Sequence, residues 1–131
     1  MPIVRIDIQS GKPTAYKRAL LRGVREGIAS ALGVPHERIM QRIVETPVED
    51  IDSPDIKTDR LTIVEVTMLP RTPELKEVMY AEIARYLYRD PGVSDHDLVV
   101  LVRDPAAECF YLNGAMQCAM PSTGPAAGSE E

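Results

Sequence analysis

Two stretches of the chain carry an apolar residue at every fourth position, which is the spacing of one face of an α-helix. The first stripe is Tyr16, Leu20, Val24, Ile28 and Leu32, and the second is Leu75, Met79, Ile83 and Leu87. Each stripe predicts an amphipathic helix whose apolar side packs against a core. The expected helices cover residues 13–32 and 73–89, with a proline at each start and Gly33 and Gly92 shortly after their ends.

Short segments rich in aliphatic and β-branched residues flank both helices and predict four strands. They cover residues 3–9, 39–45, 61–69 and 98–103. The last of them is almost continuously apolar, which predicts a strand buried on both faces. A further short hairpin is expected within residues 108–117, where Asn113-Gly114 is a turn signal. The order strand, helix, strand occurs twice and predicts two β-α-β units, each with a right-handed crossover between parallel strands.

The two units are related by one constant shift of 59 positions. Gly33 falls on Gly92, and the four residues of the second stripe fall on members of the first. Lys17 falls on Lys76. The predicted fold class is α+β (α/β), with two tandem β-α-β units that form one four-stranded sheet and place both helices on one face. The other face of the sheet needs a cover, so we expect the chain to oligomerise through it.

The domain organisation follows from this repeat. We expect residues 1–118 to form a single domain of two fused units, 1–57 and 60–118. The segment between them, around residues 46–60, contains two prolines and several acidic residues and is typical of a linker. Residues 119–131 have no apolar period and are predicted to be a disordered tail.

Composition limits the classes of function. With 15 basic and 20 acidic residues, the chain has a net charge of −5, which gives no reason to expect nucleic-acid binding. No apolar run approaches the roughly 20 residues that span a membrane, and no secretory signal is recognisable, so we expect a cytoplasmic protein without a membrane partner. Cys109 and Cys118 have neither a CxxC partner nor a histidine at metal-ligand spacing, so we expect reduced thiols and no metal site.

The residue with the most distinctive chemistry is Pro2, which directly precedes the first predicted strand. We expect Met1 to be removed, because the residue that follows it is small. Pro2 would then carry a free secondary amine, which no internal proline can offer. An α-amino group has a pKa of roughly 7.7–8.0, and apolar surroundings or a nearby cation would lower it toward neutrality. Because a base works best when its pKa lies near the working pH, Pro2 is the first candidate for a catalytic residue.

Several motifs around this proline make the chain similar to the tautomerase superfamily. They are Pro2 itself, Gly11-Lys12 before the first helix, residues 31–35 (Ala-Leu-Gly-Val-Pro) at its exit, and residues 70–76 (Pro-Arg-Thr-Pro-Glu-Leu-Lys) at the start of the second helix. The first unit resembles 4-oxalocrotonate tautomerase. The whole chain, from residue 2 to about residue 117, resembles the branch that contains malonate semialdehyde decarboxylase and cis-3-chloroacrylic acid dehalogenase.

This resemblance implies an enzyme: a keto–enol tautomerase (isomerase) of the N-terminal-proline type, acting on a small 2-hydroxy-dienoate or enol acid. It implies that the reaction needs no cofactor, that the substrate is a small anionic carboxylate, and that double-length chains form homotrimers. Pro2 matches the catalytic proline of the family. Its equivalent in the second unit, 59 positions on, is Leu61, which has no free amine, so one site per chain is expected.

The resemblance also implies a cation that binds the substrate. The substrate-binding arginine of the short tautomerases falls on Lys12 in the first unit and on Arg71 in the second. In the fused branch the second unit supplies this cation, so Arg71 is the expected residue. The planar guanidinium of arginine can bind a carboxylate through two parallel hydrogen bonds.

Aromatic and acidic residues complete the site that the resemblance implies. Phe110 falls on the apolar wall of the short tautomerases. Tyr111 falls on an aromatic residue of the decarboxylase and could donate a hydrogen bond to a developing enolate. The acidic residue that orients water or substrate in the decarboxylase falls on Arg38, or on Glu37 if one residue is skipped.

Other positions depart from the family pattern. The second arginine of the decarboxylase falls on Leu69, and its tryptophan falls on Cys109. Two alternatives to a tautomerase therefore stay open. One is a lyase-type enzyme, a decarboxylase or a hydratase/dehalogenase, that acts on a three-carbon acid such as malonate semialdehyde or a 3-haloacrylate and uses a cationic Pro2. The other is an inactive structural relative, which has the fold without the activity.

Overall fold

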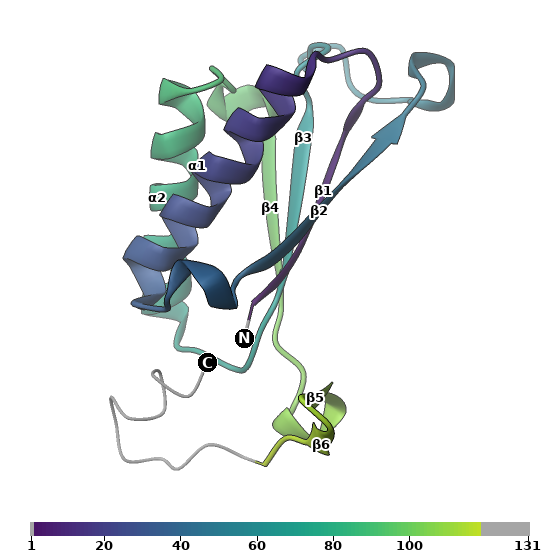
Figure 1. Ribbon diagram of the computed structural model, residues 1–131. Coiled ribbons are helices and arrows are strands. Elements are labelled where there is room, and N and C mark those ends of the chain that lie inside the picture. Colours follow the sequence, from purple (N-terminus) through teal and green to yellow (C-terminus); the bar gives the residue numbers. More distant parts are fainter. Residues whose placement is uncertain (1, 119–131) are drawn as a thin grey trace.

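The computed structural model describes residues 2–118, which form a sheet layer, a helix layer and a short hairpin at one end (Figure 1). In chain order the main elements are β1 (Ile3–Gln9), α1 (Thr14–Leu32), β2 (Met40–Thr46), β3 (Thr62–Thr67), α2 (Pro73–Arg89) and β4 (Leu98–Arg103). The hairpin consists of β5 (Tyr111–Leu112) and β6 (Ala115–Met116). Each predicted helix and strand is present, with bounds that differ by at most two residues. The tail predicted for residues 119–131 lies outside the described residues.

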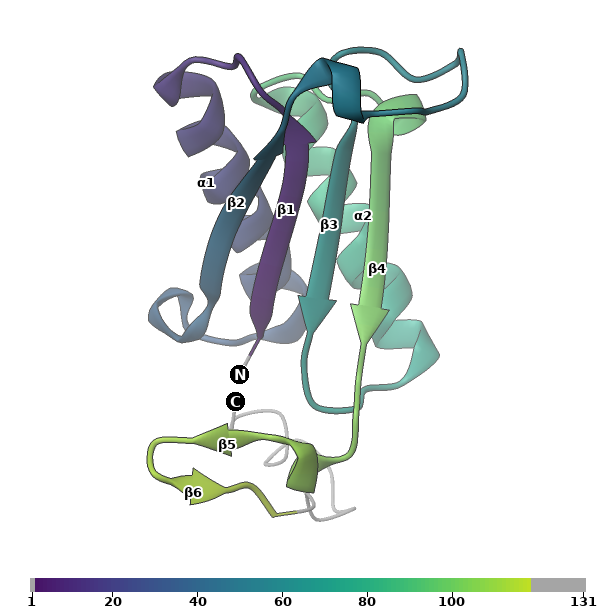
Figure 2. The same cartoon turned by 90° about the vertical axis from the view of Figure 1, so that its right-hand side faces the viewer.

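The four long strands form one mixed sheet in the order β2-β1-β3-β4 (Figure 2). β1 is parallel to β2 and β3 is parallel to β4, whereas β1 and β3, at the centre, are antiparallel. The two helices pack side by side on one face of the sheet (Figure 1). The predicted fold class is confirmed. Because the central strands are antiparallel, both strands of the second unit point in the direction opposite to the two strands of the first unit.

The strand pairing refines the shift between the two units. The pairs that show this are Ile3 with Met40 in the first unit and Ile63 with Val99 in the second. The second strands are thus 59 residues apart (99 − 40), whereas the first strands are 60 apart (63 − 3). By this register Thr62, rather than Leu61, occupies the place of Pro2 in the second unit. Thr62 is also an internal residue, so its nitrogen belongs to a peptide bond.

The core lies between the sheet and the two helices. Alternate residues of the central strands point into it, and Val4 and Ile6 of β1 are both 0% exposed. They meet the apolar stripes of the helices. Gly27 lets α1 and α2 approach closely, because a Cβ atom there would lie 2.8 Å from the Cα atom of Ile83. The interior is close-packed at this point, and a methyl group has no room without a backbone shift.

The predicted hairpin is also present. β5 and β6 pair in an antiparallel manner, and the two residues between them, Asn113 and Gly114, have φ angles of 54° and 83°. These left-handed values are those of the tight turn for which an Asn-Gly pair is the usual sequence.

β4 is not buried on both faces in the single chain, contrary to the prediction. It is an edge strand, and the helices cover only one face of the sheet. Leu101 of β4 lies on the uncovered face and is 46% exposed, and Met40 on the same face is 54% exposed. The apolar residues of β4 therefore divide between two faces: Val100 and Val102 pack against the core, whereas Leu101 lies on the uncovered face.

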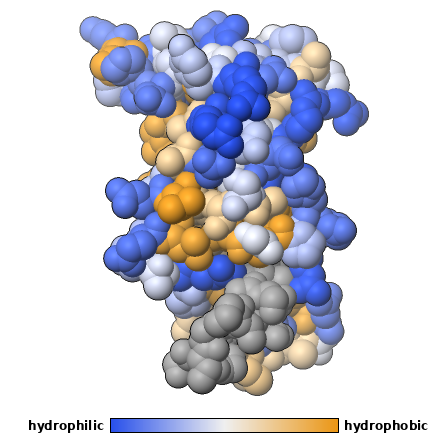
Figure 3. Space-filling view, turned by 90° about the vertical axis from the view of Figure 1, so that its left-hand side faces the viewer, coloured by the Kyte–Doolittle hydropathy of each residue, from blue (hydrophilic) through white to orange (hydrophobic). Residues whose placement is uncertain are grey.

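The outer face of the helix layer carries mainly hydrophilic side chains around a smaller apolar area (Figure 3). Across residues 2–118, no helix is long and apolar enough to cross a membrane. Cys109 and Cys118 are both exposed and do not form a disulfide.

Candidate active site

Pro2 lies at the end of the sheet where β1 and β2 begin. It is buried, and its carbonyl oxygen accepts a hydrogen bond from the amide of Met40, with N and O 3.1 Å apart. β3 ends here, because it is antiparallel to β1 and Thr67 pairs with Ile3. Extending this register by one residue places Pro2 opposite Met68, whose side chain is fully buried. Pro2 therefore lies next to the core and at the point where the two units meet.

Arg71 lies at the same end, in the loop that connects β3 with α2 (Figure 2). It is three residues beyond Met68 and directly precedes Thr72, the N-cap of α2. The Thr72 hydroxyl accepts a hydrogen bond from the amide of Leu75 at 3.2 Å, which fixes the end of the loop. The Arg71 side chain is half-buried, and its Nη2 atom is shielded from solvent. The antiparallel central strands thus bring the start of the first unit and this arginine to one end.

Lys12, the counterpart of Arg71 in the repeat, lies at the opposite end of the sheet, beyond the end of β1. Its ammonium donates a hydrogen bond to the carbonyl oxygen of Asp59 at 2.6 Å. The same nitrogen lies 5.7 Å from the centre of the Tyr16 ring. Within one chain, the structure brings Arg71 and not Lys12 to the end that contains Pro2.

Phe110 and Tyr111 lie beyond the Pro2 end of the sheet, where the chain leaves β4 and forms the hairpin (Figure 2). Phe110 is half-buried, and its amide donates a hydrogen bond to the carbonyl oxygen of Ala107 at 3.0 Å. Tyr111 is 78% exposed. Of the two aromatic residues, only Phe110 is partly enclosed by its own chain.

Glu37 is also at the Pro2 end, in the short 3-10 turn His36–Arg38 that leads into β2. Its side chain is exposed. The turn is tied to α1, because Nε2 of His36 lies 2.9 Å from a carboxylate oxygen of Glu26. Glu37 and Arg38 share this exposed turn, so both positions considered for the acidic residue of the site lie near the same strand end.

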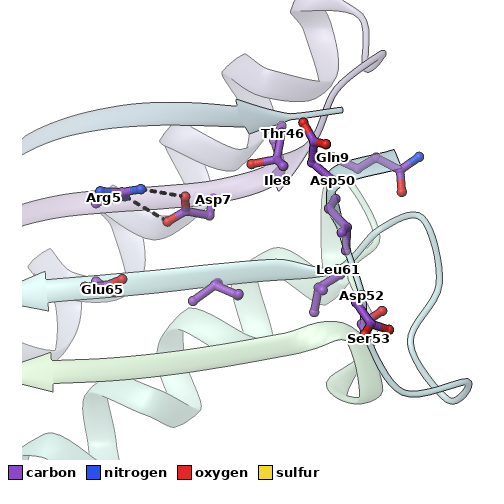
Figure 4. Close-up of a pocket in the computed structure, with 12 residues that line it drawn as sticks. Arg5, Asp7, Ile8, Gln9, Thr46, Asp50, Asp52, Ser53, Leu61 and Glu65 are labelled. Atoms are coloured by element: carbon purple, nitrogen blue, oxygen red, sulfur yellow. Dashed lines mark hydrogen bonds and ion pairs between the residues drawn. The ribbon is translucent and has the colours of Figure 1, made fainter. Parts of the chain in front are cut away.

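A cavity of about 400 Å³ lies elsewhere, on the uncovered face of the sheet toward the ends of β1 and β2 (Figure 4). Arg5 and Asp7 form two hydrogen bonds beside it, of 3.0 and 3.1 Å. One basic and four acidic residues line this cavity, so its charge is unfavourable for a carboxylate ligand. Its lining includes none of the predicted site residues. In the described part of the chain, no group of three or more His, Cys, Asp or Glu could hold a metal ion.

One ion pair at the Pro2 end is absent from the sequence-based prediction. Nζ of Lys76, in the first turn of α2, lies 2.5 Å from a carboxylate oxygen of Asp104, which directly follows β4. A sequence signal for it exists, because Lys17 and Glu45 are the repeat counterparts of these residues, 59 positions earlier. That pair forms as well, at 3.1 Å.

The sequence is similar to a tautomerase family model and to two probable tautomerases. The family model described as "Tautomerase enzyme" matches residues 54–109, a segment that contains Arg71 but not Pro2. The probable tautomerase YrdN of Bacillus subtilis (strain 168) is 27% identical over 107 residues, which cover 78% of this chain and 83% of YrdN. The probable tautomerase YusQ of the same organism is 24% identical over 108 residues, which cover 78% of this chain and 85% of YusQ.

Solved structures with the same fold include a malonate semialdehyde decarboxylase, with a TM-score of 0.78 and 21% identity over 85% of this chain and 90% of that one. A symmetric trimer of a fused 4-OT has a TM-score of 0.76 and 19% identity over 88% of this chain and 94% of that one. The family model, the two probable tautomerases and these solved structures together support a relationship of this chain to the tautomerase superfamily.

The candidate residues of this chain divide between the two ends of the sheet. Pro2, Arg71 and Glu37 are at one end, with Phe110 and Tyr111 beyond it. Lys12 is at the other. In the described part of the chain, one end of the sheet therefore combines Pro2 with Arg71.

Proposed function

We propose that this chain is a cofactor-independent keto–enol tautomerase that acts in the cytoplasm on a small 2-hydroxy-dienoate or enol acid. The observation that carries the proposal is the antiparallel pairing of β1 and β3, which puts Pro2 and the Arg71 loop at one end of the sheet. A small enol carboxylate needs a base for its proton and a cation for its charge. At this end, Pro2 could supply the base and Arg71 could supply the cation.

In the proposed reaction, Arg71 binds the substrate carboxylate through two parallel hydrogen bonds. Once Met1 is removed, the neutral secondary amine of Pro2 accepts the proton of the enol hydroxyl, and the electron pair left behind is delocalised onto carbon as the carbonyl forms. The protonated amine then returns the proton to that carbon. The product is the keto isomer, no atom is gained or lost, and the amine is regenerated. Phe110 would form an apolar wall that excludes water from these transfers.

Two measurements test this function. Intact mass determines whether Met1 is removed, because a retained Met1 would convert the Pro2 nitrogen into a peptide nitrogen. Ketonisation of 2-hydroxymuconate and of phenylenolpyruvate is then compared for the wild type and Pro2→Ala, which keeps a terminal amine but makes it primary. We expect kcat/KM to fall about 10²–10⁴-fold. Equal activities would mean that Pro2 is not the base, and a wild type no faster than the uncatalysed reaction would identify an inactive relative.

The position of Glu37 favours a second candidate, a decarboxylase or hydratase/dehalogenase. Glu37 lies on an exposed turn at the Pro2 end, where a carboxylate could activate water while a cationic Pro2 acts as an acid. Release of bromide from 3-bromoacrylate and loss of malonate semialdehyde would be measured for the wild type and Glu37→Gln. Activity that Glu37→Gln abolishes would favour this candidate over the tautomerase.

We also propose that the chain forms a homotrimer through the uncovered face of its sheet. That face carries the exposed apolar residues Met40 and Leu101 as well as the ion pair of Arg5 and Asp7. A fused 4-OT with the same fold is a symmetric trimer. Size-exclusion chromatography with light scattering should give three times the mass of one chain, and Leu101→Glu should shift the protein to monomers because it puts a charge into the interface. A monomeric wild type would refute the trimer.

A further inference from the structure

The ion pair between Lys76 and Asp104 lies beside the proposed site. Lys76 Nζ is 2.5 Å from Asp104 Oδ2, and the two side chains are only 23% and 30% exposed. The pair joins the first turn of α2 to the residue that follows β4. Since both side chains are largely enclosed, the pair is less screened by solvent than an ion pair on an open surface.

This ion pair and a backbone hydrogen bond connect the two ends of the loop that contains Arg71 to the end of β4. At the start of the loop, the amide of Met68 donates a hydrogen bond to the carbonyl oxygen of Arg103, with N and O 2.9 Å apart. From there the chain runs through Arg71 to Lys76, and the ion pair leads back to Asp104, the neighbour of Arg103. The loop is therefore fixed by a backbone hydrogen bond at its start and by the ion pair at its end.

Asp104 is also the point from which the segment containing Phe110 leaves the sheet. After Asp104 the chain forms the 3-10 turn Ala107–Cys109 and continues into the hairpin. A contact that fixes Lys76 against Asp104 thus acts on two parts of the proposed site at once, the loop of the cation and the base of the apolar wall.

The first unit contains the matching pair at the far end of the sheet. Lys17 Nζ is 3.1 Å from a carboxylate oxygen of Glu45, and the side chains are 30% and 35% exposed. This pair flanks the loop of Lys12 in the way that the second pair flanks the loop of Arg71. The two ion pairs therefore occupy equivalent positions in the two units. The pair of Lys76 and Asp104 lies at the Pro2 end of the sheet, and the pair of Lys17 and Glu45 lies at the opposite end.

We propose that Lys76 and Asp104 are positioning residues of the active site, and this inference rests on the proposed function. The pair sets the spacing between the Arg71 loop and the Phe110 segment, so that a carboxylate bound to Arg71 is held against Pro2.

The test compares Lys76→Met and Asp104→Asn with the matched variants Lys17→Met and Glu45→Gln. Because the two pairs are similarly exposed, we expect similar losses in melting temperature. Only the variants at the Pro2 end should lose about 10–100-fold in kcat/KM for ketonisation, mainly through a higher KM. The double variant with reversed charges, Lys76→Asp with Asp104→Lys, should recover part of the loss. Equal kinetic effects of the two pairs, or none from either, would overturn the proposal.

Amide hydrogen exchange tests the same inference without any activity. In Lys76→Met, the amides of Met68 and Phe110, which donate hydrogen bonds to Arg103 and Ala107, should exchange about tenfold faster than in the wild type, whereas Lys17→Met should leave both unchanged. A wild type without ketonisation activity that shows this pattern would refute the tautomerase function and support the positioning of these segments. Unchanged exchange in Lys76→Met would overturn the inference even in an active enzyme.

Discussion

The amide nitrogen of Met40 lies 3.1 Å from the carbonyl oxygen of Pro2 and donates a hydrogen bond to it. This bond ties residue 2 to β2 through its carbonyl group and makes no use of the proline ring or nitrogen. The place of the Pro2 nitrogen therefore depends on the start of β2. A change in Met40 can disturb the proposed base without touching its chemistry.

Met40→Pro removes this donor, because proline has no amide hydrogen. Proline is tolerated at the first residue of an edge strand, so the fold should survive with a loss of about 1 kcal/mol in the free energy of unfolding. kcat/KM for ketonisation should fall about tenfold or more, since the base is less well positioned. Met40→Leu keeps the amide and serves as the control in the same kinetic and unfolding measurements. Equal activity of the two variants would contradict the role of this bond.

Arg71→Ala should raise the KM for 2-hydroxymuconate about 10–100-fold, because hydrogen bonds to a charged group contribute about 1.5–3 kcal/mol. Arg71→Lys keeps the positive charge but loses the planar guanidinium, so its KM should lie between those of the wild type and Arg71→Ala. Lys12→Ala removes the repeat counterpart at the other end of the sheet and should change KM by less than about threefold. If Lys12→Ala raises KM as much as Arg71→Ala, the substrate cation is supplied by the opposite end of a neighbouring chain.

Gly27→Ala should destabilise the fold by about 1–3 kcal/mol, although alanine favours helices. The new Cβ atom would lie 2.8 Å from both the Cα and the backbone N atom of Ile83, so the two helices would have to move apart. Gly23→Ala is the matched control on the same helix face. Its Cβ atom would lie 2.8 Å from Leu87 Cδ2, the far end of a flexible side chain, so it should cost less. Urea unfolding of both variants measures the difference, and a Gly27→Ala as stable as Gly23→Ala would disagree with this packing.

Tyr16→Phe should stabilise the protein by about 1 kcal/mol, because a buried polar group without a partner costs about 1–3 kcal/mol. The Tyr16 hydroxyl is buried and has no hydrogen-bond partner among the residues that the structure describes. Burial also raises the pKa of this hydroxyl above its ordinary value of 10.0.

The raised pKa makes this effect depend on pH. The folded state keeps the neutral hydroxyl, whereas the unfolded chain ionises it above pH 10 or so, so the stability of the wild type should decrease as the pH rises through that range. Tyr16→Phe lacks the titrating group and should lose less. Urea unfolding of the wild type and Tyr16→Phe at pH 8 and at pH 10.5 measures the stabilisation and its dependence on pH. Identical unfolding curves for the two proteins would contradict a buried Tyr16 hydroxyl without a hydrogen-bond partner.

Features that depend on neighbouring residues were predictable from the sequence. α2 begins at Pro73 and ends at Arg89 as predicted, because an apolar stripe, a capping threonine and a proline all act within a few residues. β4 also has the predicted bounds, but its predicted burial on both faces is wrong for the single chain. A run of apolar residues does not specify which strand lies at an edge, because strand order depends on contacts between distant segments.

The sequence alone determined the local elements, the repeat of about 59 residues and the presence of Pro2 before the first strand. It placed Lys12 and Arg71 at equivalent positions, and the resemblance to the fused branch favoured Arg71, but the repeat itself did not indicate which of them is close to Pro2. Only the tertiary structure decided this, because β1 and β3 pair in antiparallel directions and the end of one unit therefore meets the start of the other. The one-residue difference in strand register and the contact between Lys76 and Asp104 were decided in the same way. Periodicity is a property of adjacent residues, whereas strand direction and register depend on backbone hydrogen bonds and core packing between segments far apart in the chain.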